Sequence, residues 1–257
     1  MFRIDLNSDL GESFGPWCMG MDREVMEHVS SANVACGFHA GDAQVMLKTV
    51  QAAKEASVAV GAHPGFPDLQ GFGRRTMGCS PDEVYAFVLY QIGAMQAVCA
   101  AHDVRLQHVK AHGSMYNQAA KDLAMAKAIA SATRDAGGKL VLMGLANSLF
   151  EQAAAEEGVP YAAEAFADRG YMNDGSLVPR NKPGAFIHDP EEAAERIVRL
   201  VKEGVVRSAD GVDIKLKAHS ICLHGDNPSA VDFARRIKSA LLTNGVEICN
   251  IREVLEI

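Results

Sequence analysis

The chain has 257 residues, of which 48% are hydrophobic, 22% charged and 6% aromatic. These values are typical of globular proteins and exclude disordered, collagen-like and fibrous chains. The formal net charge is −7, from 25 basic and 32 acidic residues, and no block of like charge occurs along the chain. This balance argues against a nucleic-acid partner.

The amino terminus and the cysteines point to the cytoplasm. The first residues lack the charged and apolar regions of a signal peptide. We expect no apolar run of the roughly 20 residues needed to cross a bilayer, and therefore no membrane partner. The six cysteines include no Cys-x-x-Cys pair, which favours reduced thiols.

Three predicted helices begin with a capping residue followed by a proline, at Ser80, Asp189 and Asn227. The first two also carry a glutamate three residues after the cap. After Ser80, apolar residues recur at spacings of four and three, which predicts an amphipathic helix with a buried stripe made of Val84, Val88, Ile92, Met95 and Cys99.

Short apolar segments that predict buried strands alternate with these helices, at residues 4–6, 32–36, 58–60, 106–109, 140–143, 161–165 and 221–223. Seven such βα units indicate a mostly parallel sheet in one domain covering residues 1–257. The count favours a closed or nearly closed, distorted (β/α) barrel over a doubly wound open sheet. We also expect an eighth short strand at 246–248 before a terminal helix, and a peripheral hairpin at 205–217.

Glycine, polar and titratable residues follow most of the predicted strands. Because the carboxyl ends of parallel strands meet at one edge, we expect a functional site there. Four histidines occupy equivalent positions, at His39, His63, His112 and His224. The same strand ends carry Asn7, Asp9, Glu12, Lys110, Tyr116, Glu164, Arg169 and Asp226.

Each of these residues also has a structural interpretation. A single histidine at a strand end is usually a hydrogen-bonded structural residue, but four on one edge favour a site. Asp9, Glu12 and Asp226 also fit helix caps or solvated loop acids. Lys110 follows directly from an apolar strand, where burial depresses the pKa of a lysine unless an anion is supplied.

Two long glycine- or arginine-containing loops are expected to border the site. Residues 64–79 carry Arg74 and Arg75 and are too long for a simple βα connection, which predicts a lid. Residues 168–183 carry Arg169 and Arg180. The resulting basic mouth on an acidic protein predicts a small anionic ligand.

Motifs for phosphate-loop, dinucleotide, serine-hydrolase and HExxH metalloprotease sites are absent from the sequence. Histidines and carboxylates instead favour hydrolysis by general acid–base chemistry, with or without a metal. Asp9, His63 and His112 form a plausible divalent-metal site with one carboxylate and two histidines, provided that their three strands are close in space.

The strand-end motifs together resemble the family of the 5-oxoprolinase A subunit, also called LamB/YcsF. The resemblance covers nearly the whole chain through several ordered motifs: D-L-N-S-D-L-G-E-S-F-G at 5–15, N-V-A-C-G-F-H-A-G-D at 33–42, G-A-H-P-G-F-P-D at 61–68, F-G-R-R at 72–75, V-K-A-H-G-S-M-Y-N at 109–117, E-A-F-A-D-R-G-Y at 164–171, L-V-P-R at 177–180 and C-L-H-G-D at 222–226.

The resemblance implies one component of a multi-subunit enzyme that opens the lactam of 5-oxo-L-proline (pyroglutamate) to L-glutamate, with hydrolysis of ATP to ADP and phosphate. It implies the 5-oxoprolinase subunits B and C as partners, with ATP and Mg²⁺ acting at the level of the complex. The implied fold is similar to the distorted barrels of glycoside hydrolases and polysaccharide deacetylases. A possible divalent metal on Asp9, His63 and His112 is an analogy with that group.

Under this hypothesis the residues fall into two sets. Catalytic roles are expected for Asp9, His63, Lys110, His112 and Glu164. Substrate binding is expected for Asn7, Glu12, His39, Arg74, Arg75, Tyr116, Arg169, Arg180, His224 and Asp226. The alternatives are a metal-dependent carbohydrate N-deacetylase on a related barrel and a noncatalytic lactam-binding subunit.

Overall fold

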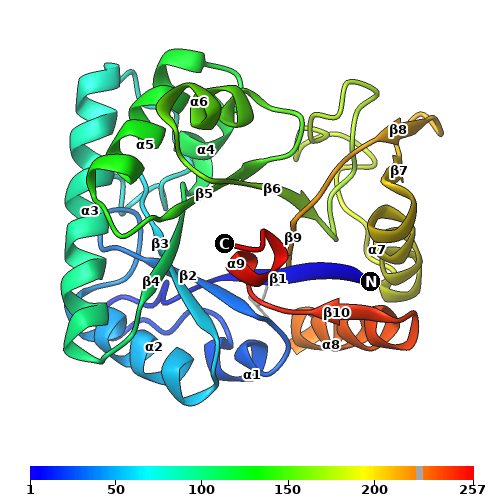
Figure 1. The fold of residues 1–257 in the computed structure, drawn as a ribbon, viewed down its shortest axis with the longest axis horizontal. Helices are drawn as coiled ribbons and strands as arrows, with labels where there is room; N and C mark the ends of the chain where they lie inside the picture. The colour runs from blue at the N-terminus through cyan, green and yellow to red at the C-terminus, as the bar shows by residue number, and fades with distance from the viewer. Residues whose placement is uncertain (224–227) are drawn as a thin grey trace.

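The computed structural model describes residues 1–223 and 228–257, and within them seven parallel strands close into a barrel (Figure 1). The strands follow each other around the ring in the order β1 (Phe2–Leu10), β2 (Ser31–Ala35), β3 (Ala59–His63), β4 (Leu106–Lys110), β5 (Val141–Leu145), β6 (Tyr161–Phe166) and β9 (Ser220–Cys222). Pairing of β9 with β1, Asp5 opposite Ser220 and Asn7 opposite Cys222, closes the ring. The predicted barrel is therefore confirmed.

Three short strands lie outside the ring. β7 (Val205–Arg207) and β8 (Asp213–Lys215) form the predicted antiparallel hairpin between β6 and β9. β10 (Val246–Ile248) pairs in parallel with the first residues of β1, Phe2 opposite Val246. The expected eighth strand thus extends the sheet beside β1 without entering the barrel.

Helices cover the outside of the barrel (Figure 1). The predicted start signals at two of them are confirmed, because Ser80 forms a capping box with Glu83 and the Asp189 carboxylate accepts two backbone N–H groups. Asn227 lies outside the described residues. The helices are α1 (Asp22–Met26), α2 (Ala43–Glu55), α3 (Pro81–Ala101), α4 (Gly113–Ala119), α5 (Leu123–Asp135), α6 (Leu149–Glu157), α7 (Pro190–Glu203), α8 (Pro228–Thr243) and α9 (Ile251–Val254).

Helix α3 corrects one expectation from the sequence. It is 21 residues long and contains an 18-residue window of mean hydropathy 1.5, so that among the described helices it is long and apolar enough to cross a membrane. One such helix is weak evidence, because core helices pass the same test. The predicted stripe from Val84 to Cys99 is buried, and α3 packs against α5, β3 and β4.

Strand β1 presents a polar face to the interior of the barrel and an apolar face to the layer outside it. On β1, Asp5, Asn7 and Asp9 contact side chains of other strands across the barrel, whereas Ile4 and Leu6 belong to the apolar core. Successive side chains of a strand point to opposite faces, so this alternation builds both layers from one segment. The polar layer leads towards the carboxyl ends of the strands.

His108 fills the middle of the barrel. Its Nε2 lies 2.7 Å from Oδ1 of Asn33, and the ring is fully buried. Gly61 on β3 makes room for this ring, since a Cβ at that position would lie 2.1 Å from His108 Nε2. A side chain at position 61 and the imidazole of His108 therefore exclude each other.

Helix α9 closes the amino-terminal end of the barrel and lies at its centre in Figure 1. Ile251 packs with Val141 and Ala162, which lie near the starts of β5 and β6. The Oδ1 atom of Asn250, the cap of α9, accepts a hydrogen bond from Gln107 at the start of β4. A ligand must therefore approach from the opposite end.

Candidate active site

A cavity of about 550 Å³ lies at the carboxyl ends of the strands. It brings together many of the residues singled out from the sequence: Asp9, Glu12, His63, Arg74, Lys110, His112, Tyr116, Arg169 and Arg180 all line it. Strands β1, β3 and β4 supply its floor, and the two long loops supply the arginines. The expected clustering at this edge of the barrel is thus observed.

Lys110 lies at the end of β4, and its ammonium is surrounded by acceptors. Its Nζ lies 2.9 Å from Oδ1 of Asp9, 2.6 Å from Oε1 of Glu164 and 3.1 Å from Oδ1 of Asn7. Only 3% of the side chain is exposed. Two carboxylates, from the strands β1 and β6 that flank β9, therefore compensate one buried cation.

These contacts determine the charges of Lys110 and Asp9. Burial alone lowers the pKa of Lys110, but the charges of Asp9 and Glu164 oppose it and raise the pKa well above its usual value. The pKa of Asp9 is in turn lowered well below its usual range, against burial, by His63 and Lys110. Lysine and aspartate are therefore both ionised around neutral pH.

Glu164 lies behind the cavity wall and joins Lys110 to Tyr116. The Tyr116 hydroxyl donates to Oε2 of Glu164 at 2.6 Å, and the Glu164 side chain is fully buried. Burial and the neighbouring carboxylate raise the pKa of Tyr116 well above its usual value. Tyr116 therefore remains a neutral hydrogen-bond donor that holds the carboxylate in place.

Asn7 and Asn33 form hydrogen bonds with the Lys110–Asp9 pair. Asn33 was not identified from the sequence. Asn33 donates from Nδ2 to Oδ1 of Asn7 at 2.7 Å and to Oδ1 of Asp9 at 2.9 Å. Asn7 donates to the Ser220 hydroxyl. An asparagine within the apolar strand at 32–36 was the available signal, because a buried amide requires partners.

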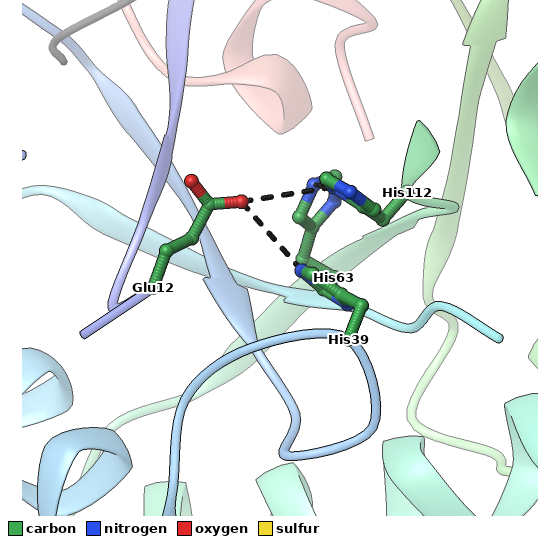
Figure 2. A group of neighbouring side chains, drawn as sticks. All are labelled: Glu12, His39, His63 and His112. Atoms are coloured by element: carbon green, nitrogen blue, oxygen red, sulfur yellow. Dashed lines mark hydrogen bonds and ion pairs between the residues drawn. The ribbon is translucent and has the colours of Figure 1, made fainter. Parts of the chain in front are cut away.

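Three histidine rings and one carboxylate form a group beside this network (Figure 2). One donor atom from each of Glu12, His39, His63 and His112 lies within 4.8 Å of the others. Oε1 of Glu12 lies 3.6 Å from Nδ1 of His112 and 3.6 Å from Nε2 of His39. Figure 2 shows the Glu12 carboxylate directed towards the rings.

His39 differs from the other two histidines because it does not line the cavity. Its ring stacks on that of His112, with centroids 3.7 Å apart and planes 3° from parallel. Neither of its nitrogens has a hydrogen-bond partner among the described residues. The structure therefore places His39 behind His112.

Burial favours the neutral form of His112 and His39. It lowers the pKa of His112 to about 2 and that of His39 well below its usual value. Burial, followed by the charge of Asp9, raises the pKa of Glu12. His39 and His112 are consequently neutral imidazoles beside a carboxylate that is costly to ionise without a nearby cation.

This donor set fits a divalent metal ion. Oε1 of Glu12 is buried and has no hydrogen-bond partner among the residues that the structure describes. The sequence suggested Asp9 as a ligand together with His63 and His112. Oδ2 of Asp9 lies 3.4 Å from Nε2 of His63. Its other oxygen, Oδ1, accepts hydrogen bonds from Lys110 and Asn33. Imidazole and carboxylate are ligands for Zn²⁺ and similar ions.

Residues 64–79 are anchored to the site and carry the two arginines to different places. His112 Nε2 lies 2.8 Å from the Phe72 carbonyl oxygen. Arg74 lines the cavity, whereas Arg75 pairs with the buried carboxylate of Asp68, with Nε 2.7 Å from Oδ1. Arg75, expected to bind substrate, is thus absent from the cavity lining.

Arg169 and Arg180 come from the second long loop and share one aromatic ring. Their guanidinium carbons lie 5.1 Å and 5.4 Å from the centre of the Phe186 ring. Arg169 donates from Nε and Nη2 to the carbonyl oxygens of Ala185 and Val178. Arg169 therefore shapes the loop, and Arg180 is exposed at the mouth of the cavity.

Three further residues concern the comparison between the site predicted from the sequence and the observed cavity. His224 and Asp226 lie outside the described residues. Asp22 lines the cavity but was not identified, and burial raises its pKa to about 6. Its Oδ2 accepts a hydrogen bond from the backbone N–H of Gly11. No motif precedes Asp22 that would have indicated this position.

The fold and the site define a (β/α)-barrel protein whose cavity combines a buried lysine–carboxylate network, histidines and arginines. The chain belongs to the LamB/YcsF family, whose sequence profile matches residues 4–256.

Two relatives match nearly the whole chain. A protein from Oceanobacillus iheyensis is 51% identical over 247 residues, 96% of each chain, and one from Bacillus subtilis is 49% identical over 253 residues, 98% of each chain. Both are named as the A subunit of 5-oxoprolinase.

Solved structures agree with the fold. The lactam utilization protein from Thermus thermophilus is 48% identical, with a TM-score of 0.92 over 96% of this chain and 99% of that one. A protein from Enterococcus faecalis V583 named for cellobiose-phosphate cleavage has a TM-score of 0.63 at 14% identity over 98% of both chains. The second likeness shows the barrel fold alone.

Proposed function

We propose that this chain is the A subunit of an ATP-dependent 5-oxoprolinase. The complex converts 5-oxo-L-proline, ATP and two water molecules into L-glutamate, ADP and phosphate. The family and the names of the full-length relatives support this proposal. The observation that carries it is the cavity, which places Arg74 and Arg180 above a buried Lys110–Asp9 pair.

The charges in the cavity suit the substrate. Pyroglutamate is a carboxylate at neutral pH, and phosphorylation of its lactam oxygen adds further negative charge. Arginine binds carboxylate and phosphate groups through paired N–H donors. We assign Arg74 and Arg180 to these anions, with Arg169 holding the loop that presents Arg180.

Activation explains the requirement for ATP. A five-membered lactam is a stabilised amide, so its carbonyl carbon is a poor electrophile. Transfer of the γ-phosphoryl group to the lactam oxygen releases ADP and makes this carbon reactive. Addition of water breaks the bond to nitrogen, which takes up a proton, and a second water releases phosphate.

The buried network is assigned to the hydrolytic steps. Lys110 holds Asp9 ionised and in position at the cavity floor, and Asp9, His63 and His112 surround the space in which water would be positioned. Glu164 acts on Lys110 from behind the wall, and Tyr116, which lines the cavity, holds Glu164 in place. Both are positioning residues in this proposal.

ATP binding is assigned to partner subunits B and C, because this chain has no recognisable phosphate loop. The test is reconstitution of the purified chain with B and C, ATP and Mg²⁺, measuring glutamate and phosphate together. We expect both products in equal amounts from the complete mixture and neither from this chain alone. Turnover by the isolated chain, or an inactive complete complex, contradicts the proposal.

Two competing functions give different results in the same assays. A lactam-binding subunit without catalytic residues predicts normal turnover per complex after Asp9→Asn or His112→Ala. A carbohydrate N-deacetylase predicts release of acetate from chitooligosaccharides without ATP. We expect neither outcome.

A further inference from the structure

The hydrogen bonds of His63 and His112 determine which ring nitrogens carry protons. Nδ1 of His63 lies 2.7 Å from the carbonyl oxygen of Lys110, and Nε2 of His112 lies 2.8 Å from that of Phe72. A carbonyl oxygen only accepts hydrogen bonds, so these two nitrogens carry the hydrogens. In a neutral imidazole with this nitrogen protonated, the other ring nitrogen presents a lone pair.

These two lone-pair nitrogens face each other. Nε2 of His63 lies 3.0 Å from Nδ1 of His112, within the buried part of the site. Two acceptors at this distance repel unless an electrophile lies next to both of them. Metal-binding histidines characteristically donate their second N–H to a carbonyl or carboxylate, as both rings do here.

Glu12 supplies the third donor. Its Oε1 lies 3.6 Å from Nδ1 of His112 and has no hydrogen-bond partner among the described residues. Ligand atoms bound at about 2.1 Å from one ion are roughly 3.0 Å apart at right angles and about 3.4 Å apart in a tetrahedron. The observed separations are close to these values.

His39 and Asp9 are less suited to bind the same ion. The His39 ring is stacked parallel to the His112 ring, so an ion in the plane of His112 lies out of the plane of His39, away from its lone pairs. Oδ1 of Asp9 is already held by Lys110 and Asn33. Oδ2 of Asp9 lies 3.4 Å from Nε2 of His63 but does not belong to the group of donor atoms that lie within 4.8 Å of one another, whereas a carboxylate oxygen of Glu12 does.

We propose that Glu12, His63 and His112 bind one divalent metal ion, with His39 packing behind the site and Asp9 outside the coordination sphere. Two imidazoles and one carboxylate favour Zn²⁺, Mn²⁺ or Fe²⁺ over Mg²⁺ and Ca²⁺, which prefer oxygen ligands. All three residues line the cavity, so the ion is accessible to a ligand there, and its chemistry is that of a Lewis acid.

Metal binding is tested on the full chain without substrate, ATP or partner subunits, so that its failure is distinct from failure of the proposed reaction. The protein is stripped with a chelator and titrated with Zn²⁺ against a chromophoric competitor. We expect one Zn²⁺ per chain, and a loss of affinity of at least about 100-fold in His63→Ala and Glu12→Gln. His102→Ala, a histidine outside the cavity lining, is the matched control and should bind as wild type.

Two further variants test the ligand assignment. Asp9→Asn and His39→Phe should each change the Zn²⁺ affinity by less than about tenfold, the lower range of effects of residues that only support a ligand. If the wild type does not bind Zn²⁺, the proposed metal site is wrong. A proton shared by His63 and His112 would then explain the short distance between their nitrogens. A loss in Asp9→Asn as large as that in Glu12→Gln overturns the ligand set.

Electron paramagnetic resonance of wild-type protein loaded with Cu²⁺ gives a result that needs no folded variant. Two coupled imidazole nitrogens are expected, from His63 and His112. A pattern of three coupled nitrogens would mean that His39 is also a ligand. A pattern of one would mean that only one of His63 and His112 binds the ion. Either pattern contradicts the proposal. Circular dichroism in chelator identifies any variant that fails to fold.

Discussion

Nζ of Lys110 lies 2.6 Å from Oε1 of Glu164, and both side chains are buried inside the barrel. Asp9 approaches the same nitrogen from β1 at 2.9 Å. A buried pair of this kind adds little stability compared with apolar residues, but removing one partner leaves a charge without compensation. The network therefore couples the stability of the barrel to the residues of the cavity.

Lys110→Met tests both consequences. We expect the kcat of the reconstituted complex to fall by roughly a hundred- to a thousandfold, the usual effect of removing a charged group that acts in the transition state. We also expect the free energy of unfolding to fall by about 3–5 kcal/mol, because Asp9 and Glu164 lose their cation. Turnover and urea unfolding are measured on the same preparation.

The double variant Lys110→Met/Glu164→Gln separates these effects. Removing the second charge should recover part of the lost stability, while kcat stays low. A Lys110→Met complex with less than about a threefold loss in kcat per folded molecule refutes the role of Lys110 in the reaction. Recovery of kcat in the double variant contradicts it equally.

Arg74 and Arg75 are adjacent in sequence and form a matched pair. Arg74→Ala should raise KM for pyroglutamate by about ten- to a hundredfold, the cost of losing a charged hydrogen bond to an anion. Arg75→Ala should leave KM within about threefold, because Arg75 binds Asp68 and does not line the cavity. Equal effects of the two variants on KM contradict this assignment.

Gly61→Ala should destabilise the protein by about 1–3 kcal/mol, because its Cβ would lie 2.1 Å from Nε2 of the buried His108. Gly93→Ala is the control: in α3 an added Cβ meets no described atom beyond the helix's own backbone within 4 Å, and alanine favours helix by up to about 1 kcal/mol. Thermal unfolding of both variants provides the measurement. Equal melting temperatures would show that the barrel adapts around His108.

Asp5 should make stability depend on pH. Burial raises its pKa to about 6, although the hydroxyls of Ser220, Ser31 and Ser30 donate to it. The folded state therefore holds a proton that the unfolded state, with a pKa of about 3.9, has released, so stability falls as pH rises from about 4 to 7. Two pKa units correspond to about 3 kcal/mol.

Urea unfolding of wild type and Asp5→Asn at several pH values isolates this contribution. The stability of the wild type minus that of the variant should decrease between pH 4 and 7. Parallel profiles over this range would show that the proton on Asp5 is not linked to folding.

Local signals in the sequence were sufficient for most of the architecture. The caps at Ser80 and Asp189 need only backbone N–H groups within three residues, and both are present as predicted. The buried stripe of α3 follows from spacing along one helix. Polar residues at strand ends indicated the edge of the site, because parallel strands bring these ends together whatever their order.

The identity of neighbours inside the site required the closed barrel. Lys110 meets Glu164 and Asp9 only because β1, β4 and β6 belong to one ring. Four strand-end histidines appeared equivalent in sequence, yet the ring of His39 stacks on that of His112, whereas His63 approaches His112 with Nε2, 3.0 Å from Nδ1. These differences depend on ring orientation, which spacing along the chain does not encode.

Arg74 and Arg75 show most simply which features the sequence predicts and which depend on the tertiary structure. The sequence alone predicts that a glycine-rich loop carries two arginines beside the site. Folding then places one of them in the cavity lining and pairs the other with Asp68, whose side chain is 2% exposed. A buried carboxylate must be compensated, and the path of the folded loop determines which of two neighbouring cations can reach it.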